Sequence, residues 1–387
     1  MLPITTTTKT TTPTTTSSVP IEESLRIAGD IHKHVRRKMR DSNILVPGAK
    51  LIDIANFIET ETKAYASIAI DAVNGYSING GIGFPVGLSV NDCAAHYHPH
   101  SQDTHAILSH SDIVKVDFGT EVNGWIVDSA FTTRIDSSSP SSPSSPSSPS
   151  SPSIQGLIRR THCNSHSFTV DDCDSLISCM KDATELGIRN IGIDVRISDW
   201  SASIEELIRS HDGIHPIYNL TGHDIKHEII HGNMRLPSVQ NAVDDKNERF
   251  KEGVYAIETF GARLPKKKNG STPRQVEVEE RGESTIFRLD PGLAKYTAAE
   301  LRNRIPIFRI QSVQRVFSQI RTRFRTLPFC ERYMQSCDRT PVSLLVKNGI
   351  LLSYPPLCTD TGSITAQFEH TVYVKDYTTV FSRDDDY

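Results

Sequence analysis

Apolar residues recur at helical spacing in several stretches of the chain, which predicts helices that each bury one face. Pro20 suits the first turn of one such helix, because a residue there needs no partner for its N–H group. Gly187 suits the end of another helix, where a left-handed residue often follows the last turn. The predicted helices are marked by Ile21 to Met39, Leu51 to Ile58, residues 174–187, and Trp200 to Ile208.

Runs of β-favouring residues predict strands elsewhere in the chain. Helices mixed with hairpins favour an architecture in which helices cover a mostly antiparallel sheet. The predicted strands are residues 113–119, 125–133, 253–260 and 364–374.

Two tracts have almost nothing to bury, and we expect both to be disordered. One is the Thr-rich tail, residues 1–18, and the other is a Ser/Pro-rich insertion, residues 137–171. The sequence predicts a small helical subdomain, residues 262–350, inserted before the last strands. Near the end of this subdomain we expect a helix capped by Thr340. The rest of residues 19–387 is expected to form one domain.

The composition narrows the class of protein. A net charge of -4 and a pI near 6.4 give no general attraction to nucleic acid or anionic membranes. Seven scattered cysteines suit reduced thiols in the cytosol better than a disulfide framework. No run approaches the roughly 20 apolar residues that span a bilayer. We therefore expect a cytoplasmic protein without a membrane segment.

Two aspartates, Asp117 and Asp128, lie within strands otherwise built of Val, Ile, Phe and Trp. If the loop is centred just before Asn123, the two aspartates face each other. If Asn123-Gly124 is a two-residue turn, Asp117 faces Ala130 and Asp128 lies on the adjacent diagonal. Both registers place the two carboxylates on one face, where like charges repel. A bound cation would remove that repulsion.

Two further carboxylates occupy similar places, Glu258 in an apolar strand and Glu369 on the polar face of the last long strand. Four unpaired charges in one interior would cost several kcal/mol each. Two divalent cations would balance them, and one imidazole would complete a ligand set that suits Mn, Fe, Co or Zn. Candidates for this imidazole are His96, His223 and His231, although a lone His is more often a surface or hydrogen-bonded residue.

Six segments resemble, in order and at suitable separations, the motifs of type 2 methionine aminopeptidases of the M24 metallopeptidase family. The resemblance implies an α+β pita-bread fold, in which a curved antiparallel sheet carries outer helices and pseudo-symmetric halves enclose metals. Residues 19–387 would be the catalytic domain, and residues 262–350 the winged-helix-like insertion of type 2 enzymes. The segments are GFPVGLSVNDCAAHYHP, IVKVDFGTEVNGWIVDSAFT, NLTGHDI, IHG, EGVYAIETFG, and YPPLC with GSITAQFEHTVYV.

The resemblance also implies a site for two divalent cations, Co, Mn, Fe or Zn. Asp117 would bind one cation, while His223 and Glu258 would bind the other. Asp128 and Glu369 would bridge both. The two cations would share a water, lower its pKa and direct it as hydroxide at a peptide carbonyl.

The same resemblance implies roles for the residues around the metals. Glu258 would accept and shuttle the proton. His231 would stabilise the oxyanion, and His96 would bond the amide nitrogen beyond the scissile bond. Both histidines would thus touch substrate, as would Phe84 and Tyr354, which match residues that line the methionine pocket.

The implied activity is a metal-dependent hydrolase, a methionyl aminopeptidase. It would remove N-terminal Met from nascent polypeptides co-translationally when the second residue is small and uncharged. We expect a monomer, with association with the ribosome left open. Two alternatives share the fold: an inactive RNA- or protein-binding module and a proline-specific peptidase. The complete set of five ligand candidates disfavours the first, while the motif CAAHYHP and the helical insertion disfavour the second.

Overall fold

A computed structural model describes most of the chain. The Thr-rich tail and nearly all of the predicted Ser/Pro insertion lie outside the described residues. No helix in the described part is both long and apolar enough to cross a bilayer. The described residues are 19–71, 79–100, 103, 105–136, 168–265, 275–334 and 339–387.

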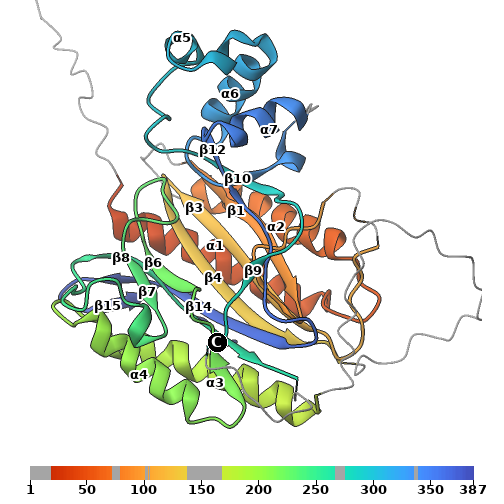
Figure 1. The fold of residues 1–387 in the computed structure, drawn as a ribbon, viewed down its shortest axis with the longest axis vertical. Helices are drawn as coiled ribbons and strands as arrows, with labels where there is room; N and C mark the ends of the chain where they lie inside the picture. The colour runs from red at the N-terminus through yellow and green to blue at the C-terminus, as the bar shows by residue number, and fades with distance from the viewer. Residues whose placement is uncertain are drawn as a thin grey trace, which may run out of the picture.

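The first half of the fold is an antiparallel sheet covered by two helices (Figure 1). The apolar stripes predicted from the sequence lie on these helices, α1 (Ile21–Asp41) and α2 (Leu51–Asp71). Val35 of α1 and Ile58 of α2 are fully buried in one cluster with Val116, which lies on the sheet. The strands, in the order β1-β3-β4, are β1 (Gly80–Val90), β3 (Ile113–Val122) and β4 (Trp125–Arg134).

The second half repeats this plan with α3 (Val170–Asn190) and α4 (Ile197–Arg209) below a larger antiparallel sheet (Figure 1). Thr169 caps α3 by accepting a bond from the N–H of Asp172. The helix therefore begins before residue 174, and the prediction that residues up to 171 are disordered is wrong at that end. The strands are β5 (Ile214–Pro216), β6 (Thr221–Ile225), β7 (Arg235–Pro237), β8 (Gly253–Arg263), β14 (Ile364–Val374) and β15 (Thr378–Val380).

Side-chain hydroxyls join the two halves along a line between β4 and β14, which we call the hydroxyl seam. Thr371 accepts a bond from the N–H of Asp128 and donates one to its carbonyl, each at 2.7 Å. Thr132 does the same for Gln367, at 2.8 and 2.6 Å. These side chains take the place of main-chain pairing, so two separate sheets act as one curved surface.

The region inserted before the last strands, which carries α5, α6 and α7, lies at one end of the molecule (Figure 1). It has a hydrophobic core of its own, which includes Phe308, Phe317 and Leu345. The predicted cap at Thr340 is wrong by one residue or more, because α7 already includes Arg339. The elements of this region are β9 (Glu279–Glu280), β10 (Ile286–Leu289), α5 (Ala298–Arg302), α6 (Gln311–Arg323), β11 (Phe329–Cys330), α7 (Arg339–Lys347), β12 (Leu351–Tyr354) and β13 (Leu357–Cys358), which pairs with β2 (Cys93–Ala95).

Candidate active site

The hairpin of β3 and β4 adopts the second of the two registers considered. Asn123 and Gly124 have φ angles of 51° and 80°, which form a two-residue turn with both residues left-handed. Asp117 consequently faces Ala130, and Asp128 lies on the adjacent diagonal, opposite Gly119. Both carboxylates point to the same side of the sheet.

The other carboxylates meet more directly, since Glu369 of β14 lies opposite Glu258 of β8. Strand β6 pairs with the other edge of β8, and there His223 lies opposite Ala256. Gly222 allows this approach, because a Cβ atom at that position would lie 2.5 Å from the carbonyl oxygen of Ala256. Like charges directly across a strand pair are unfavourable, so this site needs a compensating ligand.

The donor atoms converge in space. The Nε2 atom of His223 lies 3.7 Å from Oδ2 of Asp128 and 3.5 Å from Oε1 of Glu258. Ligand atoms of Asp128, His223 and Glu369 all lie within 4.8 Å of one another. Nδ1 of His223 lies 3.4 Å from the carbonyl of Asp224, which directs Nε2 toward the carboxylates.

Within this site, three buried carboxylate oxygens have no hydrogen-bond partner: Oδ1 of Asp117, Oδ1 of Asp128 and Oε1 of Glu369. Buried acceptors are almost always satisfied, so several such atoms facing one space indicate a missing ligand. Carboxylate oxygens with one imidazole nitrogen are donors that divalent transition metals accept. The residues of this site therefore fit the divalent metal that the family resemblance of the sequence implies.

Burial shifts the pKa of each group. It raises the pKa of Asp117 to about 7. Burial, followed by repulsion from neighbouring carboxylates, holds the pKa values of Asp128, Glu258 and Glu369 well above their ordinary range. Burial lowers the pKa of His223 to about 4, so this imidazole is neutral and free to bind a metal.

Two further histidines border this cluster. The ring of His231 lies 4.3 Å from that of His223, and its Nδ1 atom lies 3.3 Å from the hydroxyl of Tyr354. His96 has a left-handed φ of 66° and a buried Nδ1 without a partner. Burial lowers the pKa of His96 to about 4 and the pKa of His231 well below its usual value, so both rings are neutral.

All nine site residues singled out from the sequence line one pocket. Sequence reasoning missed Gln367, whose amide donates to Oε2 of Glu258 at 3.2 Å. Strand alternation was the available signal, since Gln367 lies on the same face of β14 as Glu369. It also missed the apolar wall, which comprises Ala95, Ile230, Phe260, Ile286 and Pro328.

The sequence is similar to known proteins. The model of metallopeptidase family M24 matches residues 23–145. Methionine aminopeptidase 2 of Komagataella phaffii is 36% identical over 380 residues, covering 94% of this chain and 70% of the relative. Methionine aminopeptidase 2-2 of Aspergillus niger is 35% identical, covering 94% of this chain and 74% of the relative.

Solved structures share the fold at low sequence identity. A thermophilic Arx1 aligns with a TM-score of 0.68 and 15% identity, covering 96% of this chain and 97% of that protein. Methionine aminopeptidase of Thermotoga maritima aligns with a TM-score of 0.51 and 16% identity, covering 94% and 96%. These likenesses confirm the predicted pita-bread fold. With the similarity over nearly its whole length, the chain belongs to the methionine aminopeptidase 2 family of M24 metallopeptidases.

Proposed function

We propose that this chain removes N-terminal Met from nascent polypeptides whose second residue is small and uncharged. The observation that carries the proposal is the convergence of five donor residues, from five strands, at the floor of one pocket with an apolar wall. The donors are Asp117, Asp128, His223, Glu258 and Glu369.

The four carboxylates would hold two divalent cations, Co, Mn, Fe or Zn, whose total charge equals theirs. Bound there, such ions would supply Lewis-acid activation of water and of the peptide carbonyl, and a binding point for the free α-amine. Glu258 would accept the proton of the attacking water, with its second oxygen oriented by Gln367. A second function is not favoured, because a binding module has no need for unpartnered buried carboxylates.

The neutral histidines would act on the substrate. His231, oriented by Tyr354, would donate to the developing oxyanion, and His96 would bond the amide nitrogen of the following residue. Phe84 and Tyr354, with the apolar wall, would enclose the unbranched Met side chain. The Phe84 ring packs against Gly119, where a Cβ atom would lie 2.2 Å from a ring carbon of Phe84.

The same proposal covers location and partners. Five cysteines of the described chain are free thiols, which supports the reducing cytoplasm as the compartment. A nascent-chain substrate makes transient contact with the ribosome part of the proposal, and a monomeric state remains a prediction.

The test is Met release from Met-Ala-Ser, Met-Glu-Ser and Leu-Ala-Ser peptides, after chelation and after addition of Mn(II) or Co(II). We expect release only from Met-Ala-Ser and only with metal. Asp128→Asn should lower metal affinity and release by at least about 100-fold. Asp182→Asn, on the exposed side of α3, removes an equal charge and should change neither. No release from folded wild-type protein with any of these metals would disprove the proposal.

A further inference from the structure

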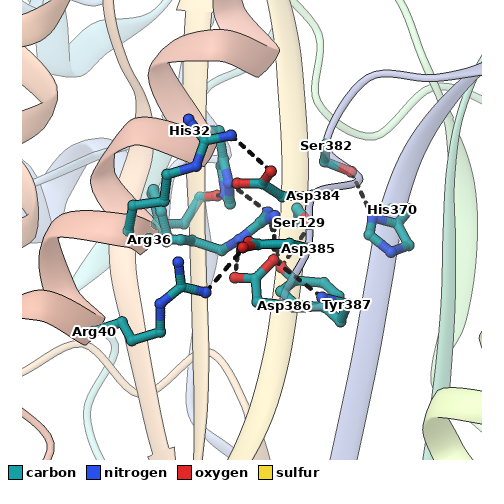
Figure 2. Close-up of polar contacts among 12 residues, drawn as sticks. His32, Arg36, Arg40, Ser129, His370, Ser382, Asp384, Asp385, Asp386 and Tyr387 are labelled. Carbon is teal, nitrogen blue, oxygen red and sulfur yellow. Dashed lines mark hydrogen bonds and ion pairs between the residues drawn. The ribbon is translucent and has the colours of Figure 1, made fainter.

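Figure 2 shows a second cluster of polar side chains, which includes Ser129 and His370, the residues that follow Asp128 and Glu369. Successive side chains of a strand point to opposite faces, so the residues after Asp117, Asp128 and Glu369 face away from the pocket. They meet there a set of side chains from α1 and from the last residues of the sequence. We call the strand residues Ser129 and His370, together with the side chains they meet, the rear cluster; those side chains are His32, Arg36, Asp386 and Tyr387.

A chain of two hydrogen bonds connects Tyr387 to both strands of the hydroxyl seam. The hydroxyl of Ser129 donates to the carbonyl of Glu369 at 2.7 Å. Its single proton is thereby used, so the hydroxyl of Tyr387, 2.9 Å away, must donate to Ser129. Ser129 directly follows Asp128, so its bond to the carbonyl of Glu369 links the two strands beside the carboxylates of Asp128 and Glu369.

The ring of Tyr387 is itself clamped. The Arg36 guanidinium lies over it, 4.3 Å from the ring centroid, and the His370 ring stacks against it at 4.8 Å and 26°. Arg36 forms a two-point ion pair with Asp386 at 2.8 and 2.9 Å and also donates to the Tyr387 hydroxyl at 3.3 Å. A guanidinium paired and stacked in this way is held rigidly.

The rear cluster reaches the third ligand strand through His32. Arg36 donates to Nδ1 of His32 at 3.1 Å, which leaves Nε2 to donate to the carbonyl of Phe118 at 2.9 Å. The His32 and Phe118 rings stack at 3.8 Å. Phe118 follows Asp117, so the cluster holds the backbone beside three of the four carboxylates.

We propose that Tyr387 is a positioning residue for the candidate metal site. Through Ser129 it fixes the separation of Asp128 and Glu369, the two residues expected to bridge both cations. This inference rests on the proposed function, in which the site binds two cations. Loss of the Tyr387 hydroxyl should lower metal affinity about 10-fold, as loss of outer-shell partners does at other metal sites. The pocket wall is untouched, so kcat should fall while KM stays constant.

The first test compares Tyr387→Phe with a matched control, Tyr255→Phe, which removes a buried hydroxyl bonded to the carbonyl of Lys251 at 2.9 Å. Full-length proteins are titrated with Co(II), and the visible absorption of the bound ion is recorded. We expect Tyr387→Phe to bind Co(II) about 10-fold more weakly with an altered spectrum. Tyr255→Phe should keep wild-type affinity and spectrum, whatever its melting temperature.

A double-mutant cycle with Ser129→Ala tests the route of the effect. Ser129→Ala alone should weaken Co(II) binding at least as much, and it serves in place of Tyr387→Phe if that variant does not fold. In the Ser129→Ala background, Tyr387→Phe should cause no further loss. Wild-type affinity in Tyr387→Phe, or the same loss in both backgrounds, would overturn the inference. Wild-type protein that binds Co(II) but releases no Met would disprove the proposed function alone.

Discussion

In the metal-free protein, individual carboxyl groups determine how the free energy of unfolding changes with pH. An acid whose pKa rises on folding favours the folded state while it is protonated, so its contribution is lost as pH rises toward the folded pKa. Burial raises the pKa of Asp117 to about 7 and holds the pKa values of Asp128, Glu258 and Glu369 well above their ordinary range. Buried histidines with lowered pKa act in the opposite direction, but only below their ordinary pKa of 6.5.

We therefore predict that the free energy of unfolding, measured with urea and a chelator present, falls between pH 6.5 and about pH 8. Asp117 alone should contribute about 1 kcal/mol to this loss. Asp117→Asn should show a shallower decline, and saturating Mn(II) should abolish the decline in wild-type protein. Unfolding free energy that is constant or rising over this range would contradict the charge argument.

The sequence was most informative where single residues broke a pattern. Asp117, Asp128, Glu258 and Glu369 could be found because charges do not belong in apolar strands. The wall residues Ile286 and Pro328 could not, since apolar residues in an inserted region look like any core. The rear cluster was equally hidden. Its ion pair joins Arg36 to Asp386, 350 positions away, and only the tertiary fold brings the two together.

At the scale of elements, the hydroxyl seam allows a direct test. Thr371→Val keeps the shape of the side chain but leaves the N–H and carbonyl of Asp128 without partners in a buried place. We expect a loss of about 2–6 kcal/mol in unfolding free energy, because two backbone groups lose their partners and each costs about 1–3 kcal/mol. Urea titration of metal-free protein would measure this loss separately from any change in metal binding.

The control is Thr379→Val on β15, where the threonine is only half-buried. An equal loss in both variants would mean that the methyl-for-hydroxyl exchange, rather than the seam, sets the cost.

Elements with regular periodicity were predicted well, and irregular ones were not. The four main helices and the strands β3, β4, β8 and β14 followed from the sequence pattern, and the turn at Asn123-Gly124 then selected one of two registers. Strand β1 was not among the predicted strands, because its glycines and Pro85 interrupt the β-favouring pattern. Its register against β3 does shift near Phe84. Helix α3 begins earlier than the predicted residue 174 because Thr169 caps it.

For the whole molecule, the candidate metal site lies across the joint between its halves. Asp117 and Asp128 belong to one sheet, while His223, Glu258 and Glu369 belong to the other. Cations bound as proposed would thus connect the halves. We predict slower amide hydrogen exchange in β4 and β14 with Mn(II) than with chelator. Peptides of α6 are an internal control and should be unaffected, because their hydrophobic core is separate. Equal slowing of amide exchange in α6, β4 and β14 would contradict the prediction that the cations act on the joint between the halves.

A metal site that lies between two halves of a protein makes the stability of the fold depend on metal supply. If the carboxylates hold cations as proposed, the folded state gains free energy in proportion to the logarithm of free metal concentration. Starvation for metal would then do more than stop catalysis. It would loosen the two halves, expose the chain to proteases and shorten its lifetime in the cell. The abundance of the protein would follow metal supply, with the hydroxyl seam setting how quickly an empty molecule is lost.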